Sequence, residues 1–275
     1  MTTLSATRPK THAIGAERPL VLGYHAISSS WPSNLAVPVR RLEEQLRYVK
    51  SRGYVGLTAT EAETARREGT LPTRAVVVTF DDGYASTLLA APILEELGFP
   101  GTVFVVTSFM ETGEPMDWAG IAEWRRPDTV EELRSMTWSD AEMLVEGGWE
   151  VGSHTVTHPL LTKSGDDFLR TELSESRAEI EKHLGSCTSI AYPYGLADER
   201  VAAEARRAGY EVAYMLTLAQ IADEPMRRPR VGMAPGDHGA RIKLQLSDFG
   251  LAARRSGVAR LARKLRFRRS WLPDE

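Results

Sequence analysis

The stretch Ala75–Tyr84, with the sequence AVVVTFDDGY, decides the fold predicted for this chain. Its first six residues are apolar or β-branched, a pattern typical of a parallel strand that is covered on both faces. Asp81 and Asp82 follow at the carboxyl end of that strand, where parallel α/β folds bind their ligands. Because adjacent carboxylates repel each other, a cation or a proton is expected between them. The alternative is structural: one aspartate caps a helix and the other lies in a solvated turn.

The same alternation of strand and helix continues on both sides of this stretch. Further short strands are predicted at 19–24, 54–57, 102–106, 149–152, 189–192 and 211–216. The helices between them begin at capping residues such as Thr60 and end at glycines such as Gly53 and Gly98. About seven repeats predict parallel βα units with right-handed crossovers, in either a barrel or an open doubly wound sheet. No linker rich in proline, glycine or serine divides them, so one domain is expected.

A second polar motif, Gly152–Pro159, follows a later strand and contains His154 and His158. Histidines four positions apart lie on one side of a helical turn, and each can reach the same ion through a ring nitrogen. Alone, the pair is a weak signal, because surface or capping histidines also fall at this spacing. Together with Asp82 it forms the two-histidine, one-carboxylate set of an open hydrolytic metal site. Zn²⁺ is the expected ion, with Co²⁺, Ni²⁺ and Mn²⁺ as alternatives.

Two further motifs end predicted strands. Tyr194 lies in the segment Ile190–Gly195, which read by itself is a proline-glycine turn. His25 closes the first strand, where a lone histidine is more often a core or capping residue. Because the carboxyl ends of parallel strands lie at the same end of a sheet, all four motifs are predicted to meet there.

In order and spacing, these motifs resemble those of the polysaccharide deacetylases of carbohydrate esterase family four. The resemblance covers about Pro19–Val231, with Thr79–Tyr84, His154–His158 and Tyr192–Gly195 as its three motifs. It implies a distorted (β/α) barrel of about seven parallel strands and hydrolysis of an N-acetyl, rather than an O-acetyl, group on a sugar. The residue roles that it implies are Asp81 as catalytic base, Asp82, His154 and His158 as metal ligands, and the Tyr194 backbone amide as oxyanion donor.

The chain departs from this family's usual pattern at two places. Ala191 occupies the position of the arginine that commonly begins the third motif and holds the base, and no late Leu-X-His motif supplies a general acid. The early Tyr24-His25 pair instead resembles the subgroup of poly-N-acetylglucosamine deacetylases, which assigns the acid role to His25. Arg230 is a candidate replacement for the missing arginine, and the alternative for Arg230 is a basic turn in solvent.

The function expected on this basis is the removal of an N-acetyl group from a sugar or glycan precursor, with release of acetate. One alternative is hydrolysis of other amide or cyclic C–N bonds on the same scaffold. The other is an inactive glycan-binding scaffold partner, against which the complete ligand set and adjacent base argue. The long stretch Phe109–Thr137, called the lip below, is predicted to cover the pocket. The candidate sugar contacts are Tyr84, Trp118, Trp124 and Tyr194.

The 275-residue chain has a net charge of −3, which is unevenly distributed. Residues 254–269 contain eight basic residues and no acidic one, which leaves 26 basic against 37 acidic residues elsewhere, a net charge of −11. An acidic body argues against a nucleic-acid partner. The single cysteine, Cys187, excludes an intrachain disulfide. With no apolar segment near the N-terminus, a cytoplasmic location is expected.

Three regions are predicted: a flexible N-terminal arm at 1–17, the catalytic domain at 18–250 and a basic amphipathic tail at 251–275. In the tail, Val258, Leu261 and Leu265 share one helical face, and the other faces are basic. Such a helix either docks on the acidic body or lies on an anionic membrane surface. Because polymer deacetylases of the resembled family generally have an export signal and none is apparent here, a small or lipid-linked glycan precursor is the expected substrate. Peripheral membrane contact would bring the enzyme to a lipid-linked sugar.

Overall fold

The computed structural model describes residues 18–216, 224–237, 239–245 and 247. The predicted arm at 1–17 and the basic tail at 251–275 lie outside these residues, so both stay predictions. Within the described part of the chain, no helix combines the length and the apolar composition that crossing a membrane requires.

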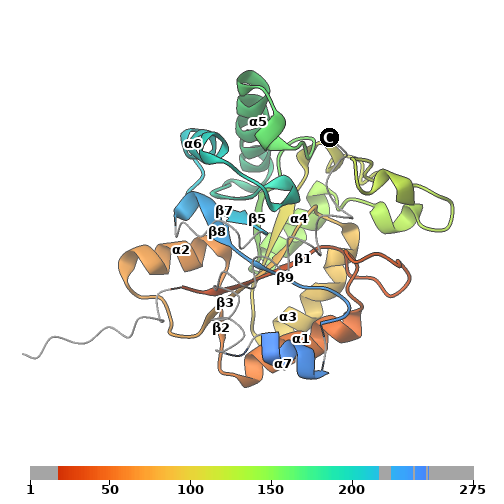
Figure 1. Ribbon diagram of the computed structural model, residues 1–275, viewed down its shortest axis with the longest axis vertical. Helices are drawn as coiled ribbons and strands as arrows, with labels where there is room; N and C mark the ends of the chain where they lie inside the picture. The colour runs from red at the N-terminus through yellow and green to blue at the C-terminus, as the bar shows by residue number, and fades with distance from the viewer. Residues whose placement is uncertain (1–17, 217–223, 238, 246, 248–275) are drawn as a thin grey trace, which may run out of the picture.

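One parallel sheet organises the structure (Figure 1). Its strand order is β8-β7-β6-β5-β4-β3-β1-β9, and β2 pairs with β3 beside this path. The predicted apolar strand, β3 (Ala75–Phe80), is buried along its whole length and pairs with β1 (Leu20–Tyr24) and β4 (Gly101–Val105). The remaining strands are β2 (Val55–Gly56), β5 (Glu150–Ser153), β6 (Ser189–Ala191), β7 (Val212–Met215), β8 (Arg228–Pro229) and β9 (Val231–Gly232).

The segment Arg228–Gly232 brings the two ends of the sheet together. Its first half, β8, pairs with β7, and its second half, β9, pairs with β1. The sheet is therefore nearly closed, which confirms the distorted (β/α) barrel and excludes the open doubly wound sheet. The path has eight strands where about seven were expected. The predicted strand at 54–57, β2, lies beside the path, and the closing segment, which was not predicted as a strand, adds two short strands because it is interrupted at Arg230.

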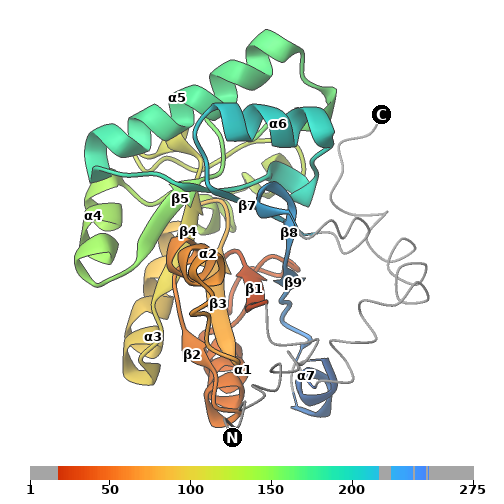
Figure 2. The same cartoon turned by 90° about the vertical axis from the view of Figure 1, so that its left-hand side faces the viewer.

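Helices cover the outer face of the barrel. They are α1 (Val39–Ser51), α3 (Ala91–Leu97), α4 (Trp138–Glu146), α5 (Asp166–Leu184) and α6 (Glu199–Arg207), with a short α7 (Gly239–Gln245) after the last strand. Their apolar stripes bury side chains such as Leu46 and Leu173 with the outward-facing Val76 and Val78 of β3 in one continuous core. α5 packs beside α6, and α1 packs beside α3 toward the opposite end of the molecule (Figure 2).

α2 (Ala59–Glu68) differs from the other helices because it closes the inside of the barrel at the amino ends of the strands. Its cap is Thr58, in a capping box with Glu61, and not Thr60 as the sequence suggested. Thr60 instead donates from its N–H (2.8 Å) and its hydroxyl (2.7 Å) to Glu150 at the start of β5. The inner cluster consists of Val21, Ala59, Ala62, Val77, Phe104, Ala191, Val212 and Tyr214.

Gly152 in β5 is closely packed against neighbouring side chains, two residues before His154. A Cβ atom added to Gly152 would lie 2.5 Å from Ser189 Oγ and 2.7 Å from the Phe104 ring. Contacts this short require the neighbouring side chains or the strand to shift. The close packing of β5 therefore fixes the position at which the histidine loop leaves the barrel.

Gly152→Ser is expected to lower the free energy of unfolding by about 1–3 kcal/mol, because overpacking forces the surrounding side chains out of their rotamers. Urea denaturation followed by circular dichroism measures the change. Gly165→Ser is the matched control, since a Cβ at Gly165 meets no atom within 4 Å and serine is a favoured residue at this helix N-cap. Equal stability of the two variants would contradict this packing.

Candidate metal centre and active site

The two adjacent aspartates leave β3 in a sharp turn that directs their side chains to different partners. The N–H of Asp81 still donates to the Tyr24 carbonyl (2.9 Å), next to the pairing of β1 with β3. Asp82 and Gly83 then both have positive φ, at 70° and 72°. Aspartate and glycine adopt this left-handed conformation more readily than most residues do. The Asp-Asp-Gly order is therefore a backbone requirement of the turn as well as a source of carboxylates.

Asp82, His154 and His158 converge at the carboxyl ends of β3 and β5. One ligand atom from each residue lies within 4.8 Å of the other two, and all three residues are buried. Asp82 Oδ1 is 3.2 Å from His154 Nε2 and 3.4 Å from His158 Nε2. The fold thus brings together the three residues that the sequence analysis assigned to a metal, and their role as ligands stays a prediction.

The donor atoms of this cluster fit a divalent cation. Asp82 Oδ1 is buried and has no hydrogen-bond partner among the described residues. His154 Nδ1 lies 2.7 Å from the Ala191 carbonyl, and an N–H donated there leaves Nε2 with its lone pair directed at the cluster. A cation between these three residues would give the Asp82 carboxylate oxygen and the imidazole lone pairs a shared partner, where otherwise acceptor atoms face one another.

The ionisation of the cluster also suits metal binding. Burial lowers the pKa of His158 although Asp82 raises it, which favours the neutral ring that metals bind. Burial alone would raise the pKa of Asp82, but the His154 and His158 imidazoles outweigh this effect and hold the pKa well below its usual value. Asp82 is therefore an ionised carboxylate at neutral pH.

The two histidines do not lie on a helical turn, which corrects the prediction made from their spacing. The segment between β5 and the next short helix is irregular, and Thr155 and His158 have positive φ values of 72° and 58°. Such conformations are strained in residues other than glycine and persist where the surrounding structure holds them. This backbone, and not helical periodicity, brings both imidazoles to Asp82.

Glu172 of α5 supports the histidine loop. Its carboxylate accepts hydrogen bonds from the N–H groups of Val156 (2.8 Å) and Thr157 (2.9 Å) and from the Thr157 hydroxyl (2.6 Å). The sequence analysis missed this residue, because a glutamate in a long charged helix resembles a solvated one. The signal was its position in the same helical stripe as Leu169 and Leu173, which are buried.

Asp81 is held by Arg230, which projects from the closing segment of the barrel. Nη1 donates to Oδ1 at 2.6 Å and Nη2 donates to Oδ2 at 2.7 Å. Nη1 also donates to the Thr79 hydroxyl at 2.9 Å. Arg230 is 1% exposed and its guanidinium lies over the Phe104 and Tyr214 rings, so it is not a basic turn in solvent. Arg230 therefore provides Asp81 with a guanidinium partner, although Ala191 occupies the position where the resembled family commonly has an arginine.

This pairing sets the ionisation of Asp81. Burial alone would raise the pKa of its carboxyl group, but the Arg230 guanidinium and the nearby His154 outweigh that effect and lower the pKa. The carboxylate therefore stays ionised at neutral pH, which is the state that a general base requires.

His25 follows β1 and lies next to Asp81. Its Nε2 is 3.8 Å from Asp81 Oδ2, and its side chain is 17% exposed, which leaves it open to an incoming molecule. Burial lowers the pKa of His25, although the Asp82 and Asp81 carboxylates raise it. The protonated ring is consequently a stronger acid than an ordinary imidazolium. The fold thus brings the predicted acid to the same site as the predicted base.

Two aromatic residues flank His158. The Trp118 ring stacks on the imidazole with 4.3 Å between centroids and an interplanar angle of 20°. The Tyr194 ring meets it edge-on at 4.7 Å and 64°, and Tyr194 has a positive φ of 58°. The Tyr194 hydroxyl donates to the Ala119 carbonyl at 3.2 Å, which joins this residue to the lip. Both predicted sugar contacts therefore lie at the candidate site.

The other two predicted sugar contacts belong to a small apolar cluster. Trp124 packs edge-on against Trp31 at 5.9 Å, and Trp31 packs against Tyr84 at 5.6 Å. Tyr84 is completely buried. This cluster supports the lip, which the structure resolves into short 3₁₀ turns at Ala122–Trp124 and Val130–Leu133.

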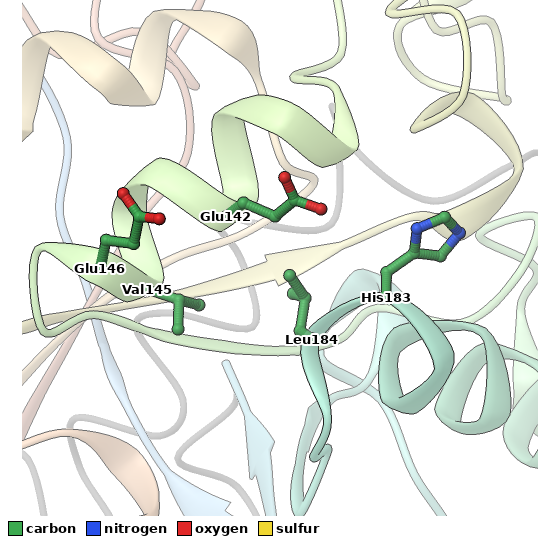
Figure 3. A pocket seen from close by; sticks show the side chains of 5 residues that line it. All are labelled: Glu142, Val145, Glu146, His183 and Leu184. Atoms are coloured by element: carbon green, nitrogen blue, oxygen red, sulfur yellow. The ribbon is translucent and has the colours of Figure 1, made fainter.

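A separate surface pocket lies between α4 and α5 (Figure 3). It is lined by Glu142, Val145, Glu146, His183 and Leu184 and by none of the site residues described above. His183 stacks on Trp138 with 4.1 Å between ring centroids. This histidine therefore has a packing role away from the candidate metal centre.

Comparison with known proteins connects the site to a family. The family model described as "Polysaccharide deacetylase" matches residues 68–213, which is more than half of the chain. The matched range includes both the Asp81-Asp82 turn and the His154–His158 loop. His25 and Arg230 lie outside it.

Relatives and solved structures agree with this match. A poly-beta-1,6-N-acetyl-D-glucosamine N-deacetylase of Staphylococcus aureus (strain MSSA476) is 27% identical over 208 residues, which cover 70% of this chain and 65% of that protein. The structure of the Streptococcus pyogenes deacetylase PplD in complex with acetate matches with a TM-score of 0.68 and 25% identity, over 83% of this chain and 97% of that one. IcaB from Ammonifex degensii matches with a TM-score of 0.66 and 25% identity, over 86% of this chain and 97% of that one.

This chain spans only 62% to 65% of the length of the curated relatives that it matches. The range that the family model matches contains the strand, the turn and the loop from which the candidate metal centre is built. On the extent of the family match and the residues that it includes, this chain belongs to the polysaccharide deacetylase family.

Proposed function

We propose that this protein is a metal-dependent deacetylase that removes an N-acetyl group from a sugar or glycan and releases acetate. The observation that carries the proposal is Asp81, which Arg230 holds as a carboxylate directly beside the three predicted metal ligands. An ionised base next to a cation site is the arrangement that hydrolysis of an amide by water needs. Family membership and the N-deacetylase name of the S. aureus relative support it.

The ion that we propose is Zn²⁺, held by Asp82, His154 and His158. Two imidazoles and one carboxylate are a donor set typical of hydrolytic zinc and leave positions for water and substrate, and the same donors accept Co²⁺, Ni²⁺ or Mn²⁺. When bound, such an ion polarises a carbonyl group and lowers the pKa of water.

Asp81 would take the proton from the attacking water. Arg230 binds both carboxylate oxygens and thereby fixes the plane of the carboxylate. Each oxygen retains a further lone pair that can accept the proton. The pairing therefore orients the base and keeps it ionised while leaving it able to act.

Tyr194 and His25 complete the proposed chemistry. The Tyr194 backbone N–H would donate to the oxyanion that forms when water attacks the carbonyl, a contact whose loss typically costs about 3 kcal/mol in the transition state. His25 would give a proton to the amide nitrogen as its bond to the acetyl carbon breaks, so that the sugar leaves as a neutral amine. Its partial exposure beside Asp81 allows it to reach a bound substrate.

The proposed substrate class is an N-acetylated sugar, either a small glycan or a lipid-linked one. The rings of Trp118 and Tyr194 flank His158 and offer apolar faces next to hydrogen-bonding groups, a combination that suits a sugar ring. Acetate release from N-acetylated oligosaccharides, sugar nucleotides and lipid-linked sugars tests the proposal and ranks these classes.

Removal of the metal is expected to abolish this acetate release, because the ion supplies the polarisation that an amide carbonyl needs. Chelation followed by dialysis should eliminate activity, and Zn²⁺ or Co²⁺ should restore it. Elemental analysis of the same samples confirms that the ion has been lost. Full activity in the metal-free protein would contradict the proposed centre.

The two aspartates should give different phenotypes. Asp81→Asn is expected to retain the metal and to lower kcat by about 10²–10⁴-fold, the usual contribution of a general base. Asp82→Asn should weaken metal binding as well as turnover. Metal content and kcat are measured for both variants, after circular dichroism has shown that each is folded. If the two phenotypes are exchanged, the assignment within the pair is reversed.

His25→Ala is expected to lower kcat on an N-acetylated sugar by about 10²–10⁴-fold without changing the metal content, because protonation of the leaving amine is lost. The decrease should be much smaller on an aryl acetate, whose leaving group needs no proton. His183→Ala, which removes a histidine that packs on Trp138, is the control. Wild-type kcat of His25→Ala on the amide would place the acid elsewhere.

A further inference from the structure

The two predicted histidine ligands are held in different ways. A histidine that binds a metal usually has its second ring nitrogen hydrogen-bonded to an acceptor, which fixes the orientation of the ring. His154 follows this rule through the Ala191 carbonyl at 2.7 Å. The corresponding atom of His158, Nδ1, is buried and has no hydrogen-bond partner among the described residues. The orientation of His158 therefore needs a different restraint.

That restraint is provided by aromatic packing. The Trp118 ring lies nearly parallel to the His158 imidazole, at 4.3 Å and 20°. The Tyr194 ring contacts the same imidazole edge-on, at 4.7 Å and 64°. Stacked and edge-to-face pairs at these separations are favourable arrangements of aromatic rings. Rotation of the imidazole away from Asp82 would break both contacts.

Trp118 belongs to the lip, and the lip is tied to the site at this residue and its neighbour. The Trp118 carbonyl accepts hydrogen bonds from the N–H groups of Ile121 and Ala122, both at 3.1 Å, so its backbone is held within the lip. The Ala119 carbonyl accepts a hydrogen bond from the Tyr194 hydroxyl at 3.2 Å. A displacement of this part of the lip would therefore remove the stacking surface from His158.

We propose that Trp118 is a positioning residue for the metal: it holds His158 in the orientation that binds the ion and so couples the lip to the metal centre. The inference rests on the proposed metal site at Asp82, His154 and His158. Because coupling between two sites is reciprocal, an ion that fixes His158 also stabilises the arrangement of the lip in which Trp118 stacks on this ring. The lip thus contributes to metal affinity.

Zinc affinity of the purified full-length chain, measured by competition with a chelating dye, tests this inference without using activity. Trp118→Leu retains an apolar side chain but removes the ring, and should weaken Zn²⁺ binding about 3- to 10-fold, in line with the typical strength of an aromatic pair. Trp118→Phe retains a ring and should recover most of that loss. Trp124→Leu is the matched control, since this second tryptophan of the lip packs on Trp31 and not on His158. It loosens the lip but leaves the ring that stacks on His158, so its Zn²⁺ affinity should fall less than that of Trp118→Leu.

Hydrogen exchange of the lip supplies the second measurement. Zn²⁺ should slow exchange in residues 109–137 of the wild type and of Trp124→Leu, and should have less effect in Trp118→Leu. If Trp118→Leu does not fold, Trp118→Met gives the same comparison.

The outcomes separate this inference from the proposed function. If the wild type binds Zn²⁺, His154→Ala abolishes the binding and Trp118→Leu binds as tightly as Trp124→Leu, the role of Trp118 is overturned and the metal centre stands. If the wild type binds no Zn²⁺, Co²⁺, Ni²⁺ or Mn²⁺, both are overturned.

Discussion

Inside the barrel, the Arg230 guanidinium donates to both carboxylate oxygens of Asp81, and neither side chain is more than 1% exposed. Burial of either charge alone would be very unfavourable, and removal of one partner from such a pair typically costs about 3–5 kcal/mol. Arg230 also interrupts the segment that pairs with β7 on one side and β1 on the other. One residue therefore lies at the closure of the barrel and holds the carboxylate at its rim, so the integrity of the fold and the ionisation of the site are linked.

The two neighbouring aspartates acquire different properties from their surroundings. Asp81 follows β3 and faces a permanent cation that neutralises it, whereas Asp82, one residue later, turns with a positive φ toward two imidazoles. Neither imidazole is a permanent cation, so Asp82 retains the capacity to bind a metal ion. The left-handed turn at Asp82 and Gly83 thus gives the adjacent carboxylates the separate surroundings that the proposed roles of base and metal ligand require.

His154 and His158, the proposed histidine ligands, depend on support from outside their own loop. Glu172 holds the strained backbone between them, and the lip packs against the ring of His158. Neither support belongs to the loop itself: Glu172 lies in α5, and Trp118 lies in the lip. Preorganisation of this kind keeps both ring nitrogens close to Asp82 before any ion arrives, which lowers the conformational cost of binding it.

By itself, the sequence determined the parts of this protein that depend on local pattern. The β-branched run of β3, the glycines that end the helices, the Asp-Asp-Gly turn and the spacing of His154 and His158 were sufficient to predict the α/β class, the family and the proximity of Asp82, His154 and His158. Tertiary structure alone decided the closure of the barrel, the irregular loop that carries the histidines, the support by Glu172 and the pairing of Arg230 with Asp81. The physical reason is that partners of buried charges are chosen by proximity in space: Arg230 lies 149 positions from Asp81 in the chain, and no local pattern distinguishes it from a solvated arginine.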